Sequence, residues 1–115
     1  MNYNVKGTGL QVSDEIRTYI EKRLVQAEKF LKNDPTAHSD VEVEYRASED
    51  RKFRAEFTLS SEAKVYRAEA QGDTLHEAID IAINELTQEL RRTKQKKLDL
   101  FRRGASKLKD YFRRF

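Results

Sequence analysis

The chain has 115 residues, of which 37% are hydrophobic and 37% charged, and it contains no cysteine. This length supports one domain with a real core, burying roughly two thirds of the surface that the unfolded chain exposes. The lack of cysteine excludes disulfides and thiolate chemistry, and no run approaches the ~18 apolar residues of a membrane span. Because residues 1–15 lack the apolar run of a signal peptide, we expect a cytoplasmic protein.

Charge is segregated along the chain. Residues 1–90 carry 12 Lys and Arg against 18 Asp and Glu, whereas residues 91–115 carry 11 against 2. The formal net charge of +3 therefore combines an acidic body with a basic end. Such asymmetry indicates contact with a polyanion, either nucleic acid or an anionic membrane. The alternative is a solvated tail whose charge only aids solubility.

The first third of the sequence predicts a strand followed by a helix. Alternation in residues 3–7 ends at two nearby glycines, which favour a turn. Ser13 then precedes two carboxylates, as is typical of a helix N-cap. Apolar residues recur from there at helical spacing, namely Ile16, Ile20, Leu24, Ala27 and Leu31. The loop at residues 33–36 ends this helix because Pro35 lacks an amide hydrogen.

Three runs of alternating apolar and charged residues come next, at residues 40–46, 52–60 and 64–70. The connections at 47–51 and 61–63 are short enough for hairpins. We therefore expect an antiparallel meander with one apolar face and one face in water.

A second helix is predicted to begin after Thr74, because Thr74 and Glu77 match a capping box. Its buried stripe consists of Leu75, Ile79, Ala82, Leu86 and Leu90. Without an internal Gly or Pro, it is expected to reach about Lys97. The order β-α-β-β-β-α predicts an α+β two-layer sandwich, with both helices on the same face of a four-stranded sheet.

Residues suited to catalysis or metal binding are sparse. The sequence has no Gly-rich phosphate loop and no nucleophile elbow, and His38 and His76 are isolated from other ligand types. Glu77 and Asp80 share one helical turn, as acids on solvated helix faces routinely do. We therefore expect no enzyme, no catalytic residue, no metal, no cofactor and no small-molecule substrate.

Residues 98–115 are predicted to form a basic amphipathic extension. Its apolar residues recur at helical spacing, namely Phe101, Ala105, Leu108, Phe112 and Phe115. Gly104 costs about 1 kcal/mol in a helix interior. A piece this short is marginal alone, so we expect it to order on contact with a partner. Arginine binds phosphate while aromatic rings stack on unpaired bases, so RNA is favoured. The candidates for base stacking are Phe101, Tyr111, Phe112 and Phe115.

A family resemblance is carried by GDTLHEAIDIAINEL at residues 72–86 and by NYNVKGTGLQVSDEIR at residues 2–17. These stretches resemble the start of helix two and the first strand and helix entry of the bacterial ribosome hibernation promoting factors. This family is also called ribosome-associated translation inhibitor or protein Y. The resemblance spans about residues 2–97, and implies a stress factor that docks on ribosomal RNA of the small ribosomal subunit. There it blocks translation by occupying the channel for messenger and transfer RNA.

The resemblance also implies which residues face RNA. On the two helices the matching basic positions are Lys22, Arg23, Lys29, Arg91, Arg92, Lys94 and Lys96. The charge pattern adds Lys97, Arg102, Arg103, Lys107, Lys109, Arg113 and Arg114. Glu85 and Gln88 stand where the family usually has Lys or Arg, so we expect the extension to replace this missing charge. We expect a domain at residues 1–97, an extension at 98–115, and a monomer off the ribosome.

Two other readings remain open from the residues alone. One is a general or double-stranded-RNA-binding module, which would be expected to lack a strand before the first helix. The other is a membrane-surface or partner-helix adaptor that uses the amphipathic extension.

Overall fold

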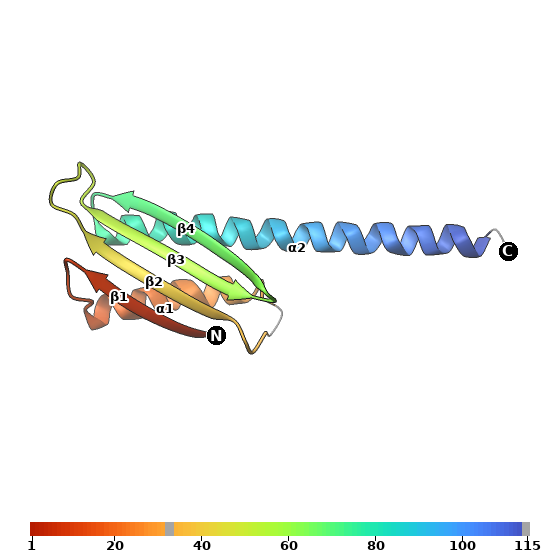
Figure 1. The fold of residues 1–115 in the computed structure, drawn as a ribbon, viewed down its shortest axis with the longest axis horizontal. Coiled ribbons are helices and arrows are strands. Elements are labelled where there is room, and N and C mark those ends of the chain that lie inside the picture. Colours follow the sequence, from red (N-terminus) through yellow and green to blue (C-terminus); the bar gives the residue numbers. More distant parts are fainter. Residues whose placement is uncertain (32–33, 114–115) are drawn as a thin grey trace.

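The computed structural model describes the backbone of residues 1–31 and 34–113 and the side chains as far as residue 104. Figure 1 shows a sheet with both helices on one of its faces. The elements are β1 (Asn2–Thr8), α1 (Asp14–Glu28), β2 (His38–Tyr45), β3 (Phe53–Ser61), β4 (Lys64–Gly72) and α2 (Leu75–Arg113). The predicted α+β class and the order of the elements are confirmed.

The sheet has the strand order β1-β2-β3-β4. β1 pairs with β2 in parallel, with Val5 opposite Val41, because α1 carries the chain back to the end at which β1 began. The β2–β3 and β3–β4 pairs are antiparallel. The meander predicted for the last three strands is therefore present, and the first strand lies at one edge.

The core lies between the inner face of the sheet and the two helices. Its fully buried large side chains come from every layer, and include Phe57, Leu59 and Val43 of the sheet, Ile20 and Leu24 of α1, and Ile79 and Leu86 of α2. Each such side chain contributes about 1.5–3 kcal/mol through removal of apolar surface from water. This packing holds both helices against the sheet and leaves their opposite sides free.

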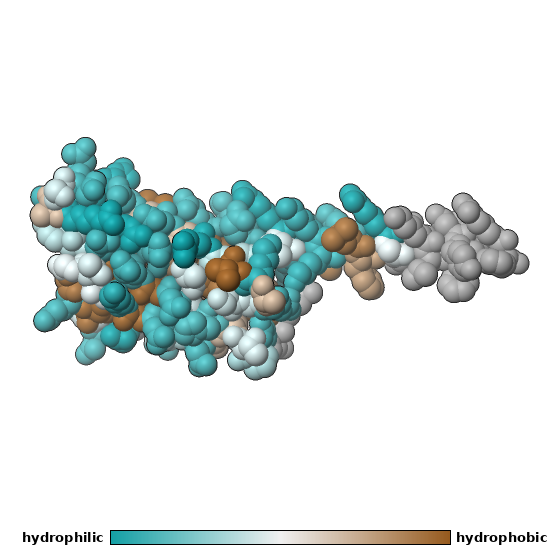
Figure 2. All heavy atoms as spheres, viewed as in Figure 1, coloured by the Kyte–Doolittle hydropathy of each residue, from teal (hydrophilic) through white to brown (hydrophobic). Residues whose placement is uncertain are grey.

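The outer face of the sheet is hydrophilic, as the face turned toward the viewer in Figure 2 shows. At its centre the guanidinium of Arg54 pairs with Glu42, Glu44, Glu56 and Glu69 at N–O distances of 2.7–3.5 Å. These carboxylates cover Arg54 so well that only 9% of the residue is exposed. The hydrogen bond from Arg54 holds the pKa of Glu69 below its ordinary value. The face is thus charged as predicted, with acids in excess around one arginine.

Both predicted helix starts are capped. The Ser13 hydroxyl accepts a hydrogen bond from the Ile16 amide at 3.2 Å, and Thr74 accepts one from the Glu77 amide at 3.1 Å. The Glu77 carboxylate accepts from the Asp73 amide at 3.4 Å, one residue before the partner that a strict capping box would use. The caps explain why both helices begin where local sequence places them.

A tight turn joins β3 to β4. Its two central residues, Glu62 and Ala63, have φ angles of 51° and 61°, the left-handed region that a two-residue hairpin turn requires. The Asp34 carboxylate accepts hydrogen bonds from the hydroxyl of Ser61 (2.8 Å) and the amide of Glu62 (3.1 Å) in this turn. It also accepts two hydrogen bonds from Thr36. Asp34 therefore ties the loop after α1 to the β3–β4 turn.

The predicted end of the second helix near Lys97 is wrong. α2 runs without a break from Leu75 to Arg113, and its last part projects beyond the sheet (Figure 1), giving the molecule extents of 69 × 29 × 19 Å. Residues 98–113 were expected to become helical only on contact with a partner, yet they continue α2. The turns of α2 that are docked on the sheet already form a helix nucleus, so each further residue needs only helix propagation. The projecting part therefore does not need a partner to begin its helix.

Candidate nucleic-acid interface

The two helices contact each other through a polar network on the side of the molecule opposite the outer sheet face. Tyr19 of α1 donates a hydrogen bond to Asp80 of α2, which raises the pKa of Tyr19. Arg23 reaches the same carboxylate at 3.4 Å and donates to the side-chain oxygen of Asn84 at 3.2 Å. Arg23, a predicted RNA-binding residue, is therefore committed to holding the helices together. Its side chain is only 26% exposed.

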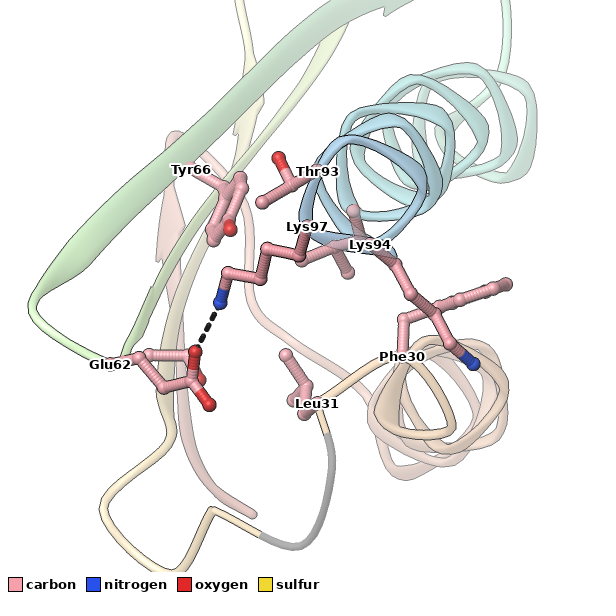
Figure 3. A pocket seen from close by; sticks show the side chains of 9 residues that line it. Phe30, Leu31, Glu62, Tyr66, Thr93, Lys94 and Lys97 are labelled. Carbon is pink, nitrogen blue, oxygen red and sulfur yellow. Dashed lines mark hydrogen bonds and ion pairs between the residues drawn. The ribbon is translucent and has the colours of Figure 1, made fainter. Parts of the chain in front are cut away.

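A second meeting point of the helices gathers three predicted residues around one aromatic ring. Lys29, which caps the C-terminus of α1, places its Nζ 5.3 Å from the centre of the Phe30 ring. Arg91 and Lys94 of α2 approach the same ring to 5.7 and 5.8 Å. Figure 3 shows Lys94 extending from α2 to the Phe30 side chain. We call Lys29, Phe30, Arg91 and Lys94 the Phe30 cluster.

Besides Arg23, two of the predicted cations pair with carboxylates within the molecule. Arg92 pairs with Glu89 one turn earlier on α2 at 2.7 Å. Lys97 pairs with Glu62 in the β3–β4 turn, which raises the pKa of Lys97. By contrast, Lys22 and Lys96 are exposed. Neither forms an ion pair within the described part of the chain.

The projecting part of α2 carries Arg102 and Arg103, both exposed, beside Phe101, which is 76% exposed. Leu98 and Leu100 are also exposed there, and Figure 2 shows an apolar group on this part of the helix. The backbone at Lys107, Lys109, Tyr111, Phe112 and Arg113 lies within α2, and their side chains are outside the described atoms. Arg114 and Phe115 lie outside the described residues altogether.

Sequence reasoning missed two residues that organise this surface. Phe30 directly follows Lys29, but nothing local indicates that residues 91 and 94 meet its ring. Asp80 was given no role, although its carboxylate accepts a hydrogen bond from Tyr19 and forms an ion pair with Arg23. His76, beside this network, stacks edge-on against Tyr19 with ring centres 4.7 Å apart. The only sequence signal for these roles is the presence of aromatic and acidic residues next to predicted cations.

The arrangement suits binding of an extended polyanion. Along the described side chains of α1 and α2, cations without a carboxylate partner include those of the Phe30 cluster and, elsewhere on the helices, Lys22 and Lys96. Lysine and arginine side chains bind phosphate oxygens through charge-assisted hydrogen bonds. Neither helix, over the residues that the structure describes, contains a stretch long and apolar enough to cross a bilayer.

This sheet with two helices on one face recurs in solved structures. The N-terminal domain of Thermus thermophilus protein Y superposes with a TM-score of 0.70 at 26% identity, covering 81% of this chain and 99% of that one. A ribosomal subunit interface protein from Coxiella burnetii superposes with a TM-score of 0.71, covering 83% of this chain and 99% of that one. Its identity of 17% makes it evidence for the fold alone.

The sequence identifies the family. A family model described as sigma 54 modulation protein / S30EA ribosomal protein matches residues 3–98, and the chain belongs to this family. The ribosome hibernation promotion factor of Bacillus subtilis (strain 168) is 27% identical over 106 residues, 92% of this chain and 55% of the relative. That of Staphylococcus aureus (strain COL) is 29% identical over 94 residues, 82% of this chain and 48% of the relative. The chain thus spans about half the length of these relatives. The resemblance found in the sequence is confirmed.

Proposed function

We propose that this chain is a ribosome-associated translation inhibitor that docks on small-subunit ribosomal RNA through α1 and α2. It occupies the channel for messenger and transfer RNA and so blocks translation. The observation that carries the proposal is the excess of positive charge in residues 91–115, which hold 11 Lys and Arg against 2 Asp and Glu and follow the docked part of α2. Membership of the family and the names of the two relatives support it.

The recognition in this proposal is electrostatic. Lys22, Lys29, Arg91, Lys94 and Lys96 bind phosphate oxygens of the RNA backbone, and shape rather than base sequence sets the position. Arg23, Arg92 and Lys97 contribute less, because each already pairs with a carboxylate. The protein acts in the cytoplasm, as a monomer when it is off the ribosome, and needs no small-molecule substrate.

The projecting part of α2 extends the interface. In this proposal residues 1–97 form the ribosome-binding domain, and residues 98–115 follow the RNA beyond it. At 1.5 Å per residue, the helix from 98 to 113 reaches about 24 Å past the sheet. Arg102 and Arg103 bind phosphates, and Phe101 stacks on an unpaired base. We assign the same roles to the remaining cations and aromatic residues of the extension.

The first test is co-sedimentation of the protein with purified bacterial small subunits across a salt series. The full chain is compared with a chain ending at Lys97. We expect binding that weakens with salt, and a shallower dependence for the shorter chain because fewer counterions are released from the RNA. No binding by either form would contradict the proposal. Equal affinity and equal salt dependence of the two forms would contradict the role of the extension.

A charge-matched pair separates position from net charge. Arg102→Gln with Arg103→Gln removes two cations from α2, whereas Lys6→Gln with Lys52→Gln removes one from β1 and one from the loop before β3. We expect the first pair to lower affinity and the second to leave it unchanged. A parallel assay of in vitro translation checks inhibition, with excess messenger RNA expected to relieve it.

A second candidate function, binding to an anionic membrane surface, is favoured by Leu98, Leu100 and Phe101, which are exposed next to Arg102 and Arg103. Vesicle flotation with anionic lipid tests it. Flotation together with absence from small subunits would replace the ribosomal proposal. The third reading, a double-stranded-RNA-binding module, lacks support because β1 precedes α1 and pairs with β2.

A further inference from the structure

The projecting part of α2 exposes large apolar side chains to water. Leu98 is 38% exposed, Leu100 is 64% exposed and Phe101 is 76% exposed. Figure 1 shows that α2 has left the sheet where it projects, and Figure 2 shows the apolar group on this part of the helix. Exposed apolar residues that lie together in this way are typical of a surface that binds a partner.

The apolar residues here repeat with the spacing of a coiled coil. Intervals of three and four residues alternate through five positions, namely Leu98, Phe101, Ala105, Leu108 and Phe112. The backbone is helical at all of them, and we call these positions the α2 seam. Alternating intervals of three and four define the a and d positions of a heptad repeat, with Leu98 at a and Phe101 at d. A seam this narrow fits one other helix, whereas a helix on a sheet or a lipid surface uses a wider apolar face.

Contact with RNA does not account for the α2 seam. Phosphate oxygens bind cations, and unpaired bases stack on aromatic rings such as that of Phe101. Leu98, Ala105 and Leu108 are aliphatic, and aliphatic side chains offer neither a hydrogen-bond donor nor a ring. They gain free energy only by leaving water, at about 0.8 kcal/mol for each buried CH₂ group. The seam therefore calls for a partner that is apolar where it touches these positions.

The charges beside the α2 seam select the chemistry of the partner. Residues 98–115 hold 6 Lys and Arg against 2 Asp. Arg102 and Lys109 stand at e positions, next to the seam, whereas Asp99 and Asp110 stand at b and f positions, away from it. Pairing with a second copy of this chain would bring like charges together, which disfavours it. A helix that has glutamate at the facing positions meets opposite charges instead.

The helix that carries the α2 seam is already formed. Leu86 and Leu90 are buried where α2 packs on the sheet, and the helix continues without a break to Arg113. Two separate short segments would both have to become helical on binding. Here only the partner has to be ordered, which lowers the entropy lost on association. A seam of about two heptads can therefore support a reversible contact.

We propose that the projecting part of α2 is a docking site for an acidic amphipathic helix of another protein, which pairs with the α2 seam as a short coiled coil. The partner has leucine or isoleucine at its own a and d positions and glutamate beside them, opposite Arg102 and Lys109. This site goes beyond the proposed function, because RNA engages the cations and rings of α2 and not its aliphatic residues. Phe101 and Arg102 serve both partners, so the acidic helix and RNA exclude each other there.

The test uses the full chain and two designed peptides of equal charge. The heptad peptide has leucine at a and d and glutamate at e and g over about four heptads. The scrambled peptide has the same residues in an order that removes the heptad spacing. Fluorescence anisotropy of labelled peptide measures binding, and we expect the heptad peptide to bind at least about tenfold more tightly. Equal binding of the two peptides, or binding of neither, would overturn the proposal.

Neighbouring residues of the projecting helix supply matched variants. Phe101→Gln changes a d position, whereas Leu100→Gln makes another exposed apolar residue polar at the adjacent c position. We expect the heptad peptide to bind about tenfold more weakly to the first variant and less than about twofold more weakly to the second. Arg102→Gln and Arg103→Gln compare e with f, and only the change at Arg102 is expected to weaken binding. Circular dichroism checks that each variant keeps its helix, and equal losses within either pair would overturn the proposal.

Two further measurements address the alternative occupants of the α2 seam. Sedimentation equilibrium of the chain alone is expected to give a monomer, and a dimer that Phe101→Gln abolishes would assign the seam to a second copy. Flotation with phosphatidylserine vesicles that falls equally in Phe101→Gln and Leu100→Gln, without binding of the heptad peptide, would assign the surface to lipid. Either result would overturn the proposal. The peptide assays contain no ribosome, so their failure leaves the proposed function intact.

Discussion

Lys97 of α2 forms an ion pair with Glu62 in the turn between β3 and β4, at the point where α2 leaves the sheet (Figure 3). One turn earlier, Lys64 of β4 donates a hydrogen bond to Thr93 at 3.4 Å. In the described part of the chain, no hydrogen bond or ion pair joins α2 beyond Lys97 to the sheet. This pair therefore marks the outer limit of the docked part of the helix.

Removing the carboxylate of this pair is expected to strengthen RNA binding. Glu62→Gln frees the Lys97 ammonium and removes a negative charge next to it, so small-subunit affinity should rise and the salt slope should steepen by up to about one. Co-sedimentation across a salt series measures both. Glu49→Gln, the same change in the loop between β2 and β3, is the control and should have no effect. Weaker binding by Glu62→Gln would show that the pair supports the interface instead.

The β3–β4 turn is expected to gain stability from a glycine. Ala63 has a φ of 61°, where an alanine is strained by about 1–2 kcal/mol and glycine is not. After the greater unfolded-state entropy of glycine is subtracted, Ala63→Gly should stabilise the fold by about 0.5–1 kcal/mol. Urea unfolding measures this. Ala47→Gly, in a turn without positive φ, should destabilise the protein, and a loss of stability in both variants would contradict the strain argument.

Gly104 in the projecting part of α2 is expected to behave in the opposite way. A Cβ built there meets nothing within 4 Å, and alanine favours a helix interior by about 1 kcal/mol over glycine. Gly104→Ala should therefore slow amide hydrogen exchange in the surrounding turns without raising the melting temperature of the sheet. As a contrast, Gly9→Ala should lower the melting temperature, because Gly9 has a φ of 70° and its Cβ would lie 2.6 Å from the Tyr45 carbonyl oxygen.

Asp34 is expected to make the stability of the fold decrease at acidic pH. Hydrogen bonds from Thr36, then from Ser61, hold the pKa of this carboxyl far below its ordinary value of 3.8. A group with a lowered folded-state pKa stabilises the fold fully above its unfolded pKa and loses that effect as pH falls toward the folded value. Asp34→Asn should therefore melt lower at pH 7, with the difference shrinking below about pH 4.

The control for this acid effect is Asp50→Asn, which makes the same change in the exposed loop between β2 and β3. Its melting curves should follow those of the unmodified chain from pH 7 to pH 3. A constant difference between Asp34→Asn and the unmodified chain over this range would assign the loss to shape rather than to ionisation.

Local sequence was sufficient for most of the fold. The caps at Ser13 and Thr74 act through hydrogen bonds to residues three positions away, so the sequence window contains all their partners. The alternation of apolar and polar residues in β2 and β3 likewise predicts which side chains are buried. The end of α2 could not be predicted in this way, because no stop signal stands near Lys97 and the docked turns before it remove the cost of nucleation.

The candidate interface was harder to predict than the fold. Composition identified the cations, but whether a cation is available depends on residues distant in the sequence. Arg23 meets Asp80 on the other helix and Lys97 meets Glu62 in a turn. Phe30 was absent from the predicted site because its ring gains importance only when α2 crosses the end of α1. The sequence therefore predicts which residues are charged, whereas the structure is needed to show which of these charges are paired.

The projecting end of α2 has a consequence for how the molecule approaches another. Residues 1–90 carry 18 Asp and Glu against 12 Lys and Arg, whereas residues 91–115 carry 11 Lys and Arg against 2 Asp and Glu. The protein is therefore an electric dipole whose positive end lies toward the C-terminal part of α2. Within about a Debye length of any polyanion, the field exerts a torque that turns this end of the helix forward, so the molecule is oriented before the first contact forms.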